Sequence, residues 1–487
     1  MLLDGEGVRA LGALLGLAAL VGTGEGLRRR GVSAATTRRL VHAGVALFVA
    51  ATPLLFARPL PVYGLAVLFT IVNAVARARR WWAGIHEARP ESWGTVALPL
   101  SVLPALAATW SMSPERLLPL HAAYLVLALS DPAASWVGER WQSNPPDQTT
   151  TAAGSVAFAG VACALLTGML VGAGHWALPT GLGAAVGAAL VSTAAEAVSR
   201  RGWDNFFVVI AVLLVLVPLQ EEHVGLGPLA GGLVLGAAFA VGAYWAGALD
   251  RRGAGTAGLF AGSLVALGGG AWVGPGVVFF GVSSLLTGVG RRASARGGPS
   301  ERRTQAQVMA NGGVAWSVLA AVALGLTAPE YGYVAFVGAL AAAAADTWAT
   351  ELGRLSPWRP WALRHVRRVP AGTSGAVSAV GTGAALAGAG SVVGTALWLQ
   401  GPLGSPALEA GGALLGAGLA GMVADSVAGA FLQARYRVLA SGPLVEEPPS
   451  ADAQLVRGWA RIGNNAVNLI GTVTGALTAL LWAGLAG

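Results

Sequence analysis

The sequence predicts an all-α integral membrane protein with about 16 transmembrane helices in two related halves, and three observations support this. Of its 487 residues, 55% are hydrophobic and only 11% are charged. Apolar stretches of about 20 residues, long enough to cross the hydrocarbon core of a bilayer, recur along the whole chain. The same motifs also occur in the same order in both halves. No soluble domain of any size fits between the apolar stretches.

The predicted spans group into two membrane domains, 1–222 and 223–487. The first apolar run is expected to remain as a span, because it lacks the basic segment that precedes a cleaved signal. The single cysteine, Cys163, lies within a span and offers no intramolecular disulfide. The spans are expected near residues 9–24, 41–57, 61–76, 94–110, 119–137, 152–172, 177–197, 205–219, 225–248, 256–271, 275–290, 308–326, 332–350, 373–400, 409–434 and 463–485.

All 31 basic residues are arginine. The lack of lysine excludes a Walker-type phosphate loop and Schiff-base chemistry. All arginines except Arg9, Arg58 and Arg116 fall in alternate connections between spans, which the positive-inside rule places in the cytoplasm. The net charge of +8 therefore indicates topology in the cell membrane and not nucleic-acid binding, although such a surface also attracts nucleotides and anionic lipid headgroups.

Acidic residues lie where several spans run into arginine-rich connections. An ionisable side chain within a span is costly, so it indicates a functional site. Because these ends are predicted to face the cytoplasm, their chemistry has access to nucleoside triphosphates. The five candidates, predicted to be catalytic, are Asp131, Glu196, Asp346, Glu351 and Asp425.

Two of these acids begin the same pattern, in which a hydroxyl residue follows after four positions and a glycine after seven. Steps of four and seven stay on one helical face. Such a stripe suits a Mg²⁺ ion that carries nucleotide phosphates, whereas helix packing through small residues is the alternative. Glu351 points about 140° away from Asp346 and is expected to face a loop. The stripes are Asp131, Ser135 and Gly138, and Asp346, Thr350 and Gly353.

The order of the motifs predicts an internal duplication. After each stripe comes a Gly/Ser/Thr-rich start of a span, at 149–160 and at 370–381. A span with another acid follows, Glu196 or Asp425, and then an arginine before a span that starts with amide side chains. The two halves are thus expected to hold two sites, or two parts of one.

Residues 25–220 resemble the dolichol/phytol kinase family of membrane enzymes, which use CTP to phosphorylate a long isoprenoid alcohol. Thr150 and Ala153 stand where that family has lysine and glutamate, so an alternative in which only the second half is active stays open. The matching segments are RRLVHAG (38–44), HEARPESWGTVALPL (86–100), SDPAASWVG (130–138), Gly154 with Ser155, and Glu196 with Asp204 and Asn205.

Residues 245–487 resemble the family of plant phytyl-phosphate kinase, and this resemblance implies phosphorylation of an isoprenyl monophosphate to the diphosphate. A fusion of the two families would carry out two successive phosphoryl transfers, with Mg²⁺ and CTP or another nucleoside triphosphate. The matching segments are FFGVSSLLTGVGRR (279–292), RRTQAQVMANGG (302–313), AAADTWATELG (343–353), VPAGTSGAVSAVGT (369–382), ADSVAGAFLQ (424–433) and GNNAVNL (463–469).

In the second half, Asp346 and Asp425 are predicted to bind metal or act as a base, with Glu351 in support. Four residues, Gly372, Thr373, Ser374 and Gly375, are predicted to cradle phosphates at a helix N-terminus. Two arginines, Arg367 and Arg368, are expected to neutralise the phosphates. The amides predicted to bind metal or nucleotide are Asn311, Asn464, Asn465 and Asn468; interhelical hydrogen bonding is the alternative.

In the first half, Asp131, Glu196 and Asp204 are the predicted metal ligands. Arg39 and His42 are expected near the lipid headgroup. The residues expected around the nucleotide phosphates are Ser135, Gly138, Gly154, Ser155 and Asn205.

Two further functions compete with the kinase hypothesis. One is a lipid enzyme similar to CTP:phosphatidate cytidylyltransferase, whose family shares acidic and glycine motifs, although its long C-terminal block is not visible here. The other is a secondary transporter, which also shows repeats, broken helices and intramembrane acids. A transporter would hold its acids near the bilayer midplane, whereas these cluster at the ends of spans.

Overall fold

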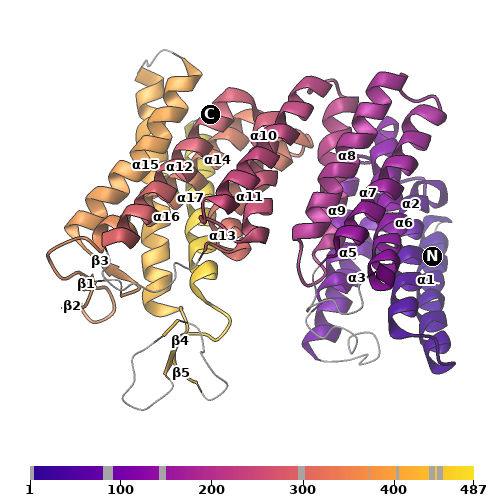
Figure 1. The fold of residues 1–487 in the computed structure, drawn as a ribbon, viewed down its shortest axis with the longest axis horizontal. Coiled ribbons are helices and arrows are strands. Elements are labelled where there is room, and N and C mark those ends of the chain that lie inside the picture. Colours follow the sequence, from indigo (N-terminus) through magenta and orange to yellow (C-terminus); the bar gives the residue numbers. More distant parts are fainter. Residues whose placement is uncertain are drawn as a thin grey trace. The chain divides into compact units, whose positions relative to one another are not determined.

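A computed structural model describes residues 5–79, 92–141, 150–293, 302–371, 373–401, 405–437, 445–446 and 453–486. The chain forms two compact units, Met1–Leu233 and Val234–Gly487 (Figure 1). Among the described residues, 13 helical stretches are long and apolar enough to cross a membrane. The prediction of an all-α integral membrane protein is confirmed.

The first unit is built around α6 and α9. The α6 helix packs against α2, α7 and α9, while α8 packs on α7 and α9. The α9 helix is almost completely buried, and α5 and α9 are shorter than the other spans. Its elements are α1 (Gly5–Arg29), α2 (Ala34–Leu55), α3 (Leu60–Ala78), α5 (Gly94–Ala108), η1 (Pro114–Arg116), α6 (Leu117–Trp141), α7 (Ala152–Thr167), η2 (Gly168–Gly172), α8 (Leu178–Val198), α9 (Asp204–Gln220) and the start of α10 (Leu226–Trp245).

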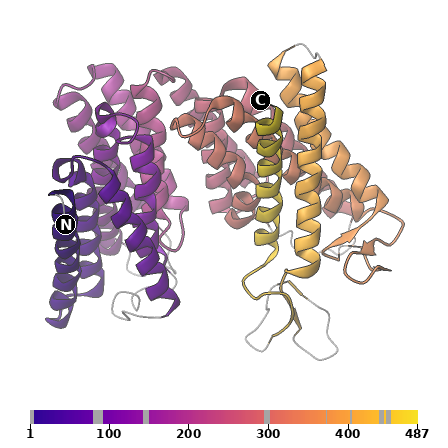
Figure 2. The same cartoon turned by 180° about the vertical axis from the view of Figure 1, so that it is seen from behind.

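In the second unit, α14 lies at the centre and contacts α12, α13, α15, α16 and α17. Seen from behind, α16 and α17 run side by side (Figure 2). The helices are α11 (Arg251–Ser263), η3 (Leu264–Gly268), α12 (Gly269–Ala293), α13 (Gln305–Ala323), α14 (Pro329–Gly353), α15 (Ala379–Gln400), α16 (Ser405–Phe431) and α17 (Asn464–Ala486).

The helical stretch from α11 to α12 reverses direction at Gly269. This residue has φ +65°, a left-handed conformation that glycine adopts without steric cost. A Cβ on Gly276 would lie 2.9 Å from the Leu264 side chain, so α12 runs back along η3. The expected pair of spans is present, but the connection predicted between residues 271 and 275 was misplaced, because the turn occurs at the glycine and Pro275 lies inside α12.

Two small antiparallel sheets, which the sequence did not predict, lie in the connections that follow α14 and α16. In the first, β1 (Trp361–Ala362) pairs with β2 (Arg367–Arg368) and β3 (Ala376–Val377). In the second, β4 (Arg435–Arg437) pairs with β5 (Gln454–Arg457). Both sheets belong to the end of the unit where α14 and α16 finish and α15 and α17 begin.

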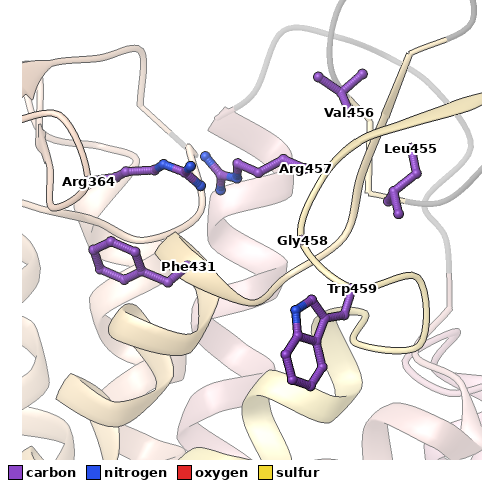
Figure 3. Close-up of a pocket in the computed structure, with 7 residues that line it drawn as sticks. All are labelled: Arg364, Phe431, Leu455, Val456, Arg457, Gly458 and Trp459. Carbon is purple, nitrogen blue, oxygen red and sulfur yellow. The ribbon is translucent and has the colours of Figure 1, made fainter.

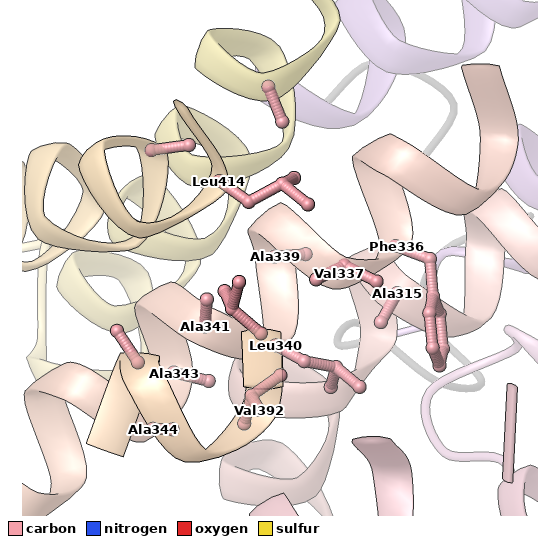
Figure 4. Packing of buried hydrophobic residues seen from close by; sticks show 14 of the residues in the cluster. Ala315, Phe336, Val337, Ala339, Leu340, Ala341, Ala343, Ala344, Val392 and Leu414 are labelled. Carbon is pink, nitrogen blue, oxygen red and sulfur yellow. The ribbon is translucent and has the colours of Figure 1, made fainter. Parts of the chain in front are cut away.

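Small side chains set the spacing of the helices around α14 (Figure 4). A Cβ on Gly475 of α17 would lie 2.5 Å from the carbonyl oxygen of Gly338, and one on Gly388 of α15 would lie 2.8 Å from that of Ala344. A Cβ on Gly421 of α16 would collide with Ala342. The alanine run of α14 is therefore packed on three sides at close range, as small residues permit between membrane helices.

Candidate functional site

The close packing of α14 and α16 brings two carboxyl groups together in the second unit. Both helices run in the same direction, and Gly421 meets Ala342. Asp425 and Asp346 each follow one helical turn later, and the side chains of these two acids interact with each other. Two carboxylates in contact within an apolar bundle repel each other unless a proton or a cation lies between them.

An amide side chain of α17, Asn468, contacts Asp425 of this pair, and Asn311 of α13 contacts Asn468. With its nitrogen facing Asp425, the Asn468 side chain donates to Asp425 Oδ2 (3.3 Å) and to the Asn464 carbonyl oxygen (3.0 Å). In the opposite orientation, Asn468 donates to Asn311 Oδ1 at 3.1 Å. Asn311 is fixed by its own bond to the Gln307 carbonyl oxygen, at 3.1 Å. Three predicted residues, Asp425, Asn468 and Asn311, are thus connected, and Asn464 takes part through its backbone.

This donor set suits a small hard cation. Carboxylate and amide oxygens are the ligands that Mg²⁺ and Ca²⁺ prefer, and Mg²⁺ is commonly held by one or two carboxylates together with water and substrate phosphates. Across the described ranges, no three His, Cys, Asp or Glu side chains lie close enough together to hold a metal ion. A cation at Asp346 and Asp425 would therefore complete its coordination with amide, water or phosphate oxygens.

Glu351 belongs to a different network, on the side of α14 that faces α12. Thr287 of α12 donates to Glu351 Oε1 at 2.8 Å. Arg303 in turn donates to the Thr287 hydroxyl and, at 3.4 Å, to the Ser283 carbonyl oxygen. Glu351 thus faces a helix where the sequence suggested a loop, and it lies away from the Asp346 stripe.

The glycine at the end of each stripe packs against the start of the next helix. In the second unit, Ser378 caps α15 by accepting from the Gly381 amide at 3.0 Å. Gly353 lies against Ser378 and Gly381, and a Cβ on Gly381 would lie 3.2 Å from the Ala349 carbonyl oxygen. The stripe glycine therefore allows the capped end of α15 to approach α14.

The first unit repeats this joint. Thr151 caps α7 by accepting from the Gly154 amide at 2.9 Å. A Cβ on Gly138 would lie 2.9 Å from the Thr151 hydroxyl, and one on Gly154 would lie 2.9 Å from the Ala134 carbonyl oxygen. Ala134 and Ala349 each follow the stripe acid by three positions, so the same contact joins the same positions in both units, as an internal duplication predicts.

The prediction that residues 372–375 form a phosphate cradle at a helix N-terminus was wrong in its placement. Gly372 lies outside the described residues, and α15 begins only at Ala379, because Ser378 caps it there. Thr373 donates to the Pro370 carbonyl oxygen, Ser374 donates to Gln433, and Gly375 has φ +71°. Residues 373–375 form a turn packed on the end of α16.

The two arginines predicted to neutralise phosphates, Arg367 and Arg368, lie on β2 and are exposed. Arg368 stacks over the Trp361 ring, with 5.7 Å from the guanidinium carbon to the ring centroid. Two other arginines lie closer to the acids and helix ends: Arg354 interacts electrostatically with Asp346, and Arg457 donates to the Gly429 carbonyl oxygen at 3.3 Å. The sequence offered one signal for Arg354, its position directly after the stripe.

In the first unit, basic side chains accompany the stripe. His42 Nε2 lies 3.5 Å from Asp131 Oδ2. Arg39 donates to Ser135 Oγ at 3.0 Å and forms an ion pair with Glu139. The predicted headgroup residues Arg39 and His42 therefore lie beside Asp131 and Ser135, both on the predicted stripe.

Two further candidate acids of the first unit, Glu196 and Asp204, interact electrostatically with Asp131. In the part of the chain that the structure describes, however, no three such side chains lie close enough together to hold a metal ion. Glu196 Oε2 is buried and has no hydrogen-bond partner among the described residues. Asn205, by contrast, donates to the Gly94 carbonyl oxygen at 3.0 Å, so its amide joins α9 to α5. Two predicted residues occupy the first turns of their helices, Ser155 in α7 and Asn465 in α17.

Comparison with known proteins places the second unit in a family. Residues 234–476 match the family described as integral membrane protein DUF92. Protein PGR of Arabidopsis thaliana is 31% identical over 220 residues, which covers 40% of this chain and 75% of the relative. No solved structure matches the chain. Through its second unit, the protein belongs to the DUF92 family of integral membrane proteins.

Proposed function

We propose that the second unit transfers a phosphoryl group from CTP, or another nucleoside triphosphate, to an isoprenyl monophosphate. A phosphate oxygen of the lipid attacks the terminal phosphorus of the nucleotide. The bond from that phosphorus to the nucleoside diphosphate breaks, and an isoprenyl diphosphate forms. The observation that carries this proposal is the contact between the carboxyl groups of Asp346 and Asp425, with the amides of Asn468 and Asn311 next to them.

Phosphoryl transfer requires mainly positioning and charge neutralisation from the protein. Asp346 and Asp425 would hold Mg²⁺, which supplies charge neutralisation on the phosphates when bound. Asn468 orients Asp425 through its side-chain amide, and Arg354 adds positive charge beside Asp346. Close packing of α14, α16 and α17 fixes these groups before the substrates bind, which lowers the cost of ordering them.

The site lies toward the ends of α14 and α16, at the arginine-rich connections. We assign this end to the cytoplasm and the protein to the cell membrane, since the positive-inside rule favours it and nucleotides are found there. A lipid substrate would keep its chain in the bilayer while its phosphate reaches the ends of the helices. This position also argues against a transport function, for which the acids would lie near the midplane.

For the first unit we propose phosphorylation of an isoprenoid alcohol of the phytol or geranylgeraniol type to its monophosphate. Support comes from the electrostatic interaction of Asp131 with Glu196 and Asp204 and from the repeated joint between stripe and capped helix. Arg39 stands beside Ser135 and could supply the charge that lysine supplies in the related kinases. The two steps together would convert the alcohol to the diphosphate.

The test is incubation of the purified protein with Mg²⁺, labelled CTP and either phytol or phytyl monophosphate. The proposal expects label in phytyl monophosphate from the alcohol and in phytyl diphosphate from the monophosphate. Product from the monophosphate alone would restrict the activity to the second unit. With no product from either lipid, the kinase proposal would fail in favour of a transporter or a cytidylyltransferase-like enzyme.

A further inference from the structure

A pocket of about 360 Å³ opens at the end of α16, between that helix and the connections that carry the two small sheets. Figure 3 shows the guanidinium groups of Arg364 and Arg457 facing each other across it. Arg364 comes from the connection between α14 and α15, and Arg457 ends β5. The remaining lining residues are Phe431, Leu455, Val456, Gly458 and Trp459.

The positive charge in this pocket is only partly compensated. Within the described parts of the chain, Arg364 has no ion pair or hydrogen bond, and the Arg457 Nε is buried without a partner. A third arginine nearby, Arg435, pairs with Glu446 at 3.1 Å. Burial, then Arg364, then Arg435 lower the pKa of the Arg457 guanidinium. Two facing guanidinium groups repel each other, and an anion between them would remove that repulsion.

One of the two pocket arginines contacts α16 close to the acidic pair along the helix. Arg457 donates to the carbonyl oxygen of Gly429, which lies four residues, one helical turn, after Asp425. One turn of helix rises about 5.4 Å. A chain of phosphates is therefore long enough to reach from a cation held by Asp425 to the guanidinium of Arg457.

An aromatic ring next to the arginines is also open to a ligand. Trp459 is 68% exposed and lines the same pocket. A nucleobase has a π-face that stacks on an exposed indole, and such stacking tolerates every base. Arginines and an aromatic ring together match the two chemical parts of a nucleotide.

We propose that this pocket binds the polyphosphate of a nucleoside triphosphate between Arg364 and Arg457, with the base against Trp459. The identity of this ligand as the phosphoryl donor rests on the proposed function, whereas the binding of polyphosphate does not. The pocket thus holds the donor on the α16 side of the acidic pair and leaves the other side to the lipid phosphate.

The experiment measures binding by titration calorimetry on the full chain in detergent, without Mg²⁺. The probes are inorganic tripolyphosphate, CTP and phytyl monophosphate. Arg364→Gln and Arg457→Gln are each expected to weaken tripolyphosphate binding about tenfold, because each removes a charge-assisted pair. Arg359→Gln, which changes an exposed arginine on the same connection, is the matched control and is expected to leave the affinity unchanged. Trp459→Ala is expected to weaken CTP binding about tenfold but not tripolyphosphate binding.

Several results would overturn the inference. Unchanged tripolyphosphate affinity in both Arg364→Gln and Arg457→Gln would exclude the pocket, and an equal loss in the Arg359→Gln control would indicate diffuse attraction to a basic surface. Displacement of tripolyphosphate by phytyl monophosphate but not by CTP would assign the pocket to the lipid phosphate. Arg457→Lys keeps a cation and tests binding if the glutamine variant does not fold. Arginine-dependent binding in a protein that transfers no phosphate would sustain the inference while the proposed function fails.

Discussion

The acidic centres of the two units share a backbone arrangement but differ in charge. In both units a stripe acid, Asp131 or Asp346, precedes a joint in which a glycine meets the capped start of the next helix. In the first unit His42 and Arg39 lie beside the stripe. In the second unit the carboxyl group of Asp425 lies beside the stripe, and the amide of Asn468 contacts Asp425.

One pair of corresponding positions shows how the difference arises. Glu139 follows Asp131 by eight positions, and Arg354 follows Asp346 by the same number. The acid at 139 pairs with Arg39 of α2, whereas the arginine at 354 interacts electrostatically with Asp346. In the first unit, basic side chains from another helix therefore lie beside Asp131 and Glu139, whereas the second unit retains a carboxyl pair that a cation from solution would complete.

The largest expected effect concerns that carboxyl pair. Asp346→Asn and Asp425→Asn are each expected to lower formation of the diphosphate by about 10²–10³-fold, the usual cost of removing one preorganised electrostatic group. The measurement is the rate of label transfer from CTP to phytyl monophosphate. The matched controls, Glu330→Gln in α14 and Glu409→Gln in α16, change exposed acids at the other ends of the same helices. Full activity in Asp346→Asn would remove the central assignment.

The next expected effect concerns the stabilisation that Mg²⁺ binding gives to the second unit. Mg²⁺ at about a hundred times its dissociation constant should raise the free energy of unfolding by about 2.7 kcal/mol. The part of this gain that comes from the second unit should disappear in Asp425→Asn and persist in Asp131→Asn, because Asp131 belongs to the other unit. Thermal unfolding with and without Mg²⁺ measures it. If the gain were lost in Asp131→Asn and retained in Asp425→Asn, the Mg²⁺ ion would be assigned to the first unit and not to the second.

The first unit can be tested by changing Arg39, the arginine beside its stripe. Arg39→Gln is expected to slow phosphorylation of phytol by about 10–100-fold, since Arg39 holds Ser135 of the stripe through a hydrogen bond. Phosphorylation of phytyl monophosphate should not change. Arg140→Gln serves as the control, because Arg140 stacks over Trp136 at 4.2 Å. Equal loss of both steps would mean that the units do not act separately.

Sequence patterns predicted the helices well because apolar length sets a membrane span directly. They also identified both Asp346 and Asp425 as candidate site residues, because an ionisable side chain within a span is costly and therefore indicates a functional site. The helix N-terminus was misplaced at residues 372–375, since Gly/Ser/Thr-rich sequence indicates a cap without fixing its position. Arg364 and Arg457 face each other because of the paths that two connections take. No local sequence pattern predicts those paths.

The repeated joint predicts matched losses of stability in the two units. Gly154→Ala would place a Cβ 2.9 Å from a carbonyl oxygen, and Gly381→Ala would place one at 3.2 Å. We expect costs of about 1–3 kcal/mol, the larger for Gly154→Ala. Gly160→Ala and Gly383→Ala, on the same helices with open space at the Cβ, should be neutral or stabilising. Denaturant unfolding in micelles measures each, and a loss in only one unit would show that the joint is not shared.

The smallest effect is expected at Glu351. Its carboxylate accepts from Thr287, which Arg303 also contacts, so this network ties α14 to α12. Glu351→Gln keeps an oxygen that can accept the same bond, and it should lower diphosphate formation only about threefold, a change of less than 1 kcal/mol. Thr287→Val removes the donor and should have a similar effect, measured in the same assay. A loss as large as that of Asp346→Asn would place Glu351 among the groups that contact the substrates, and the second unit would then use three acids in place of two.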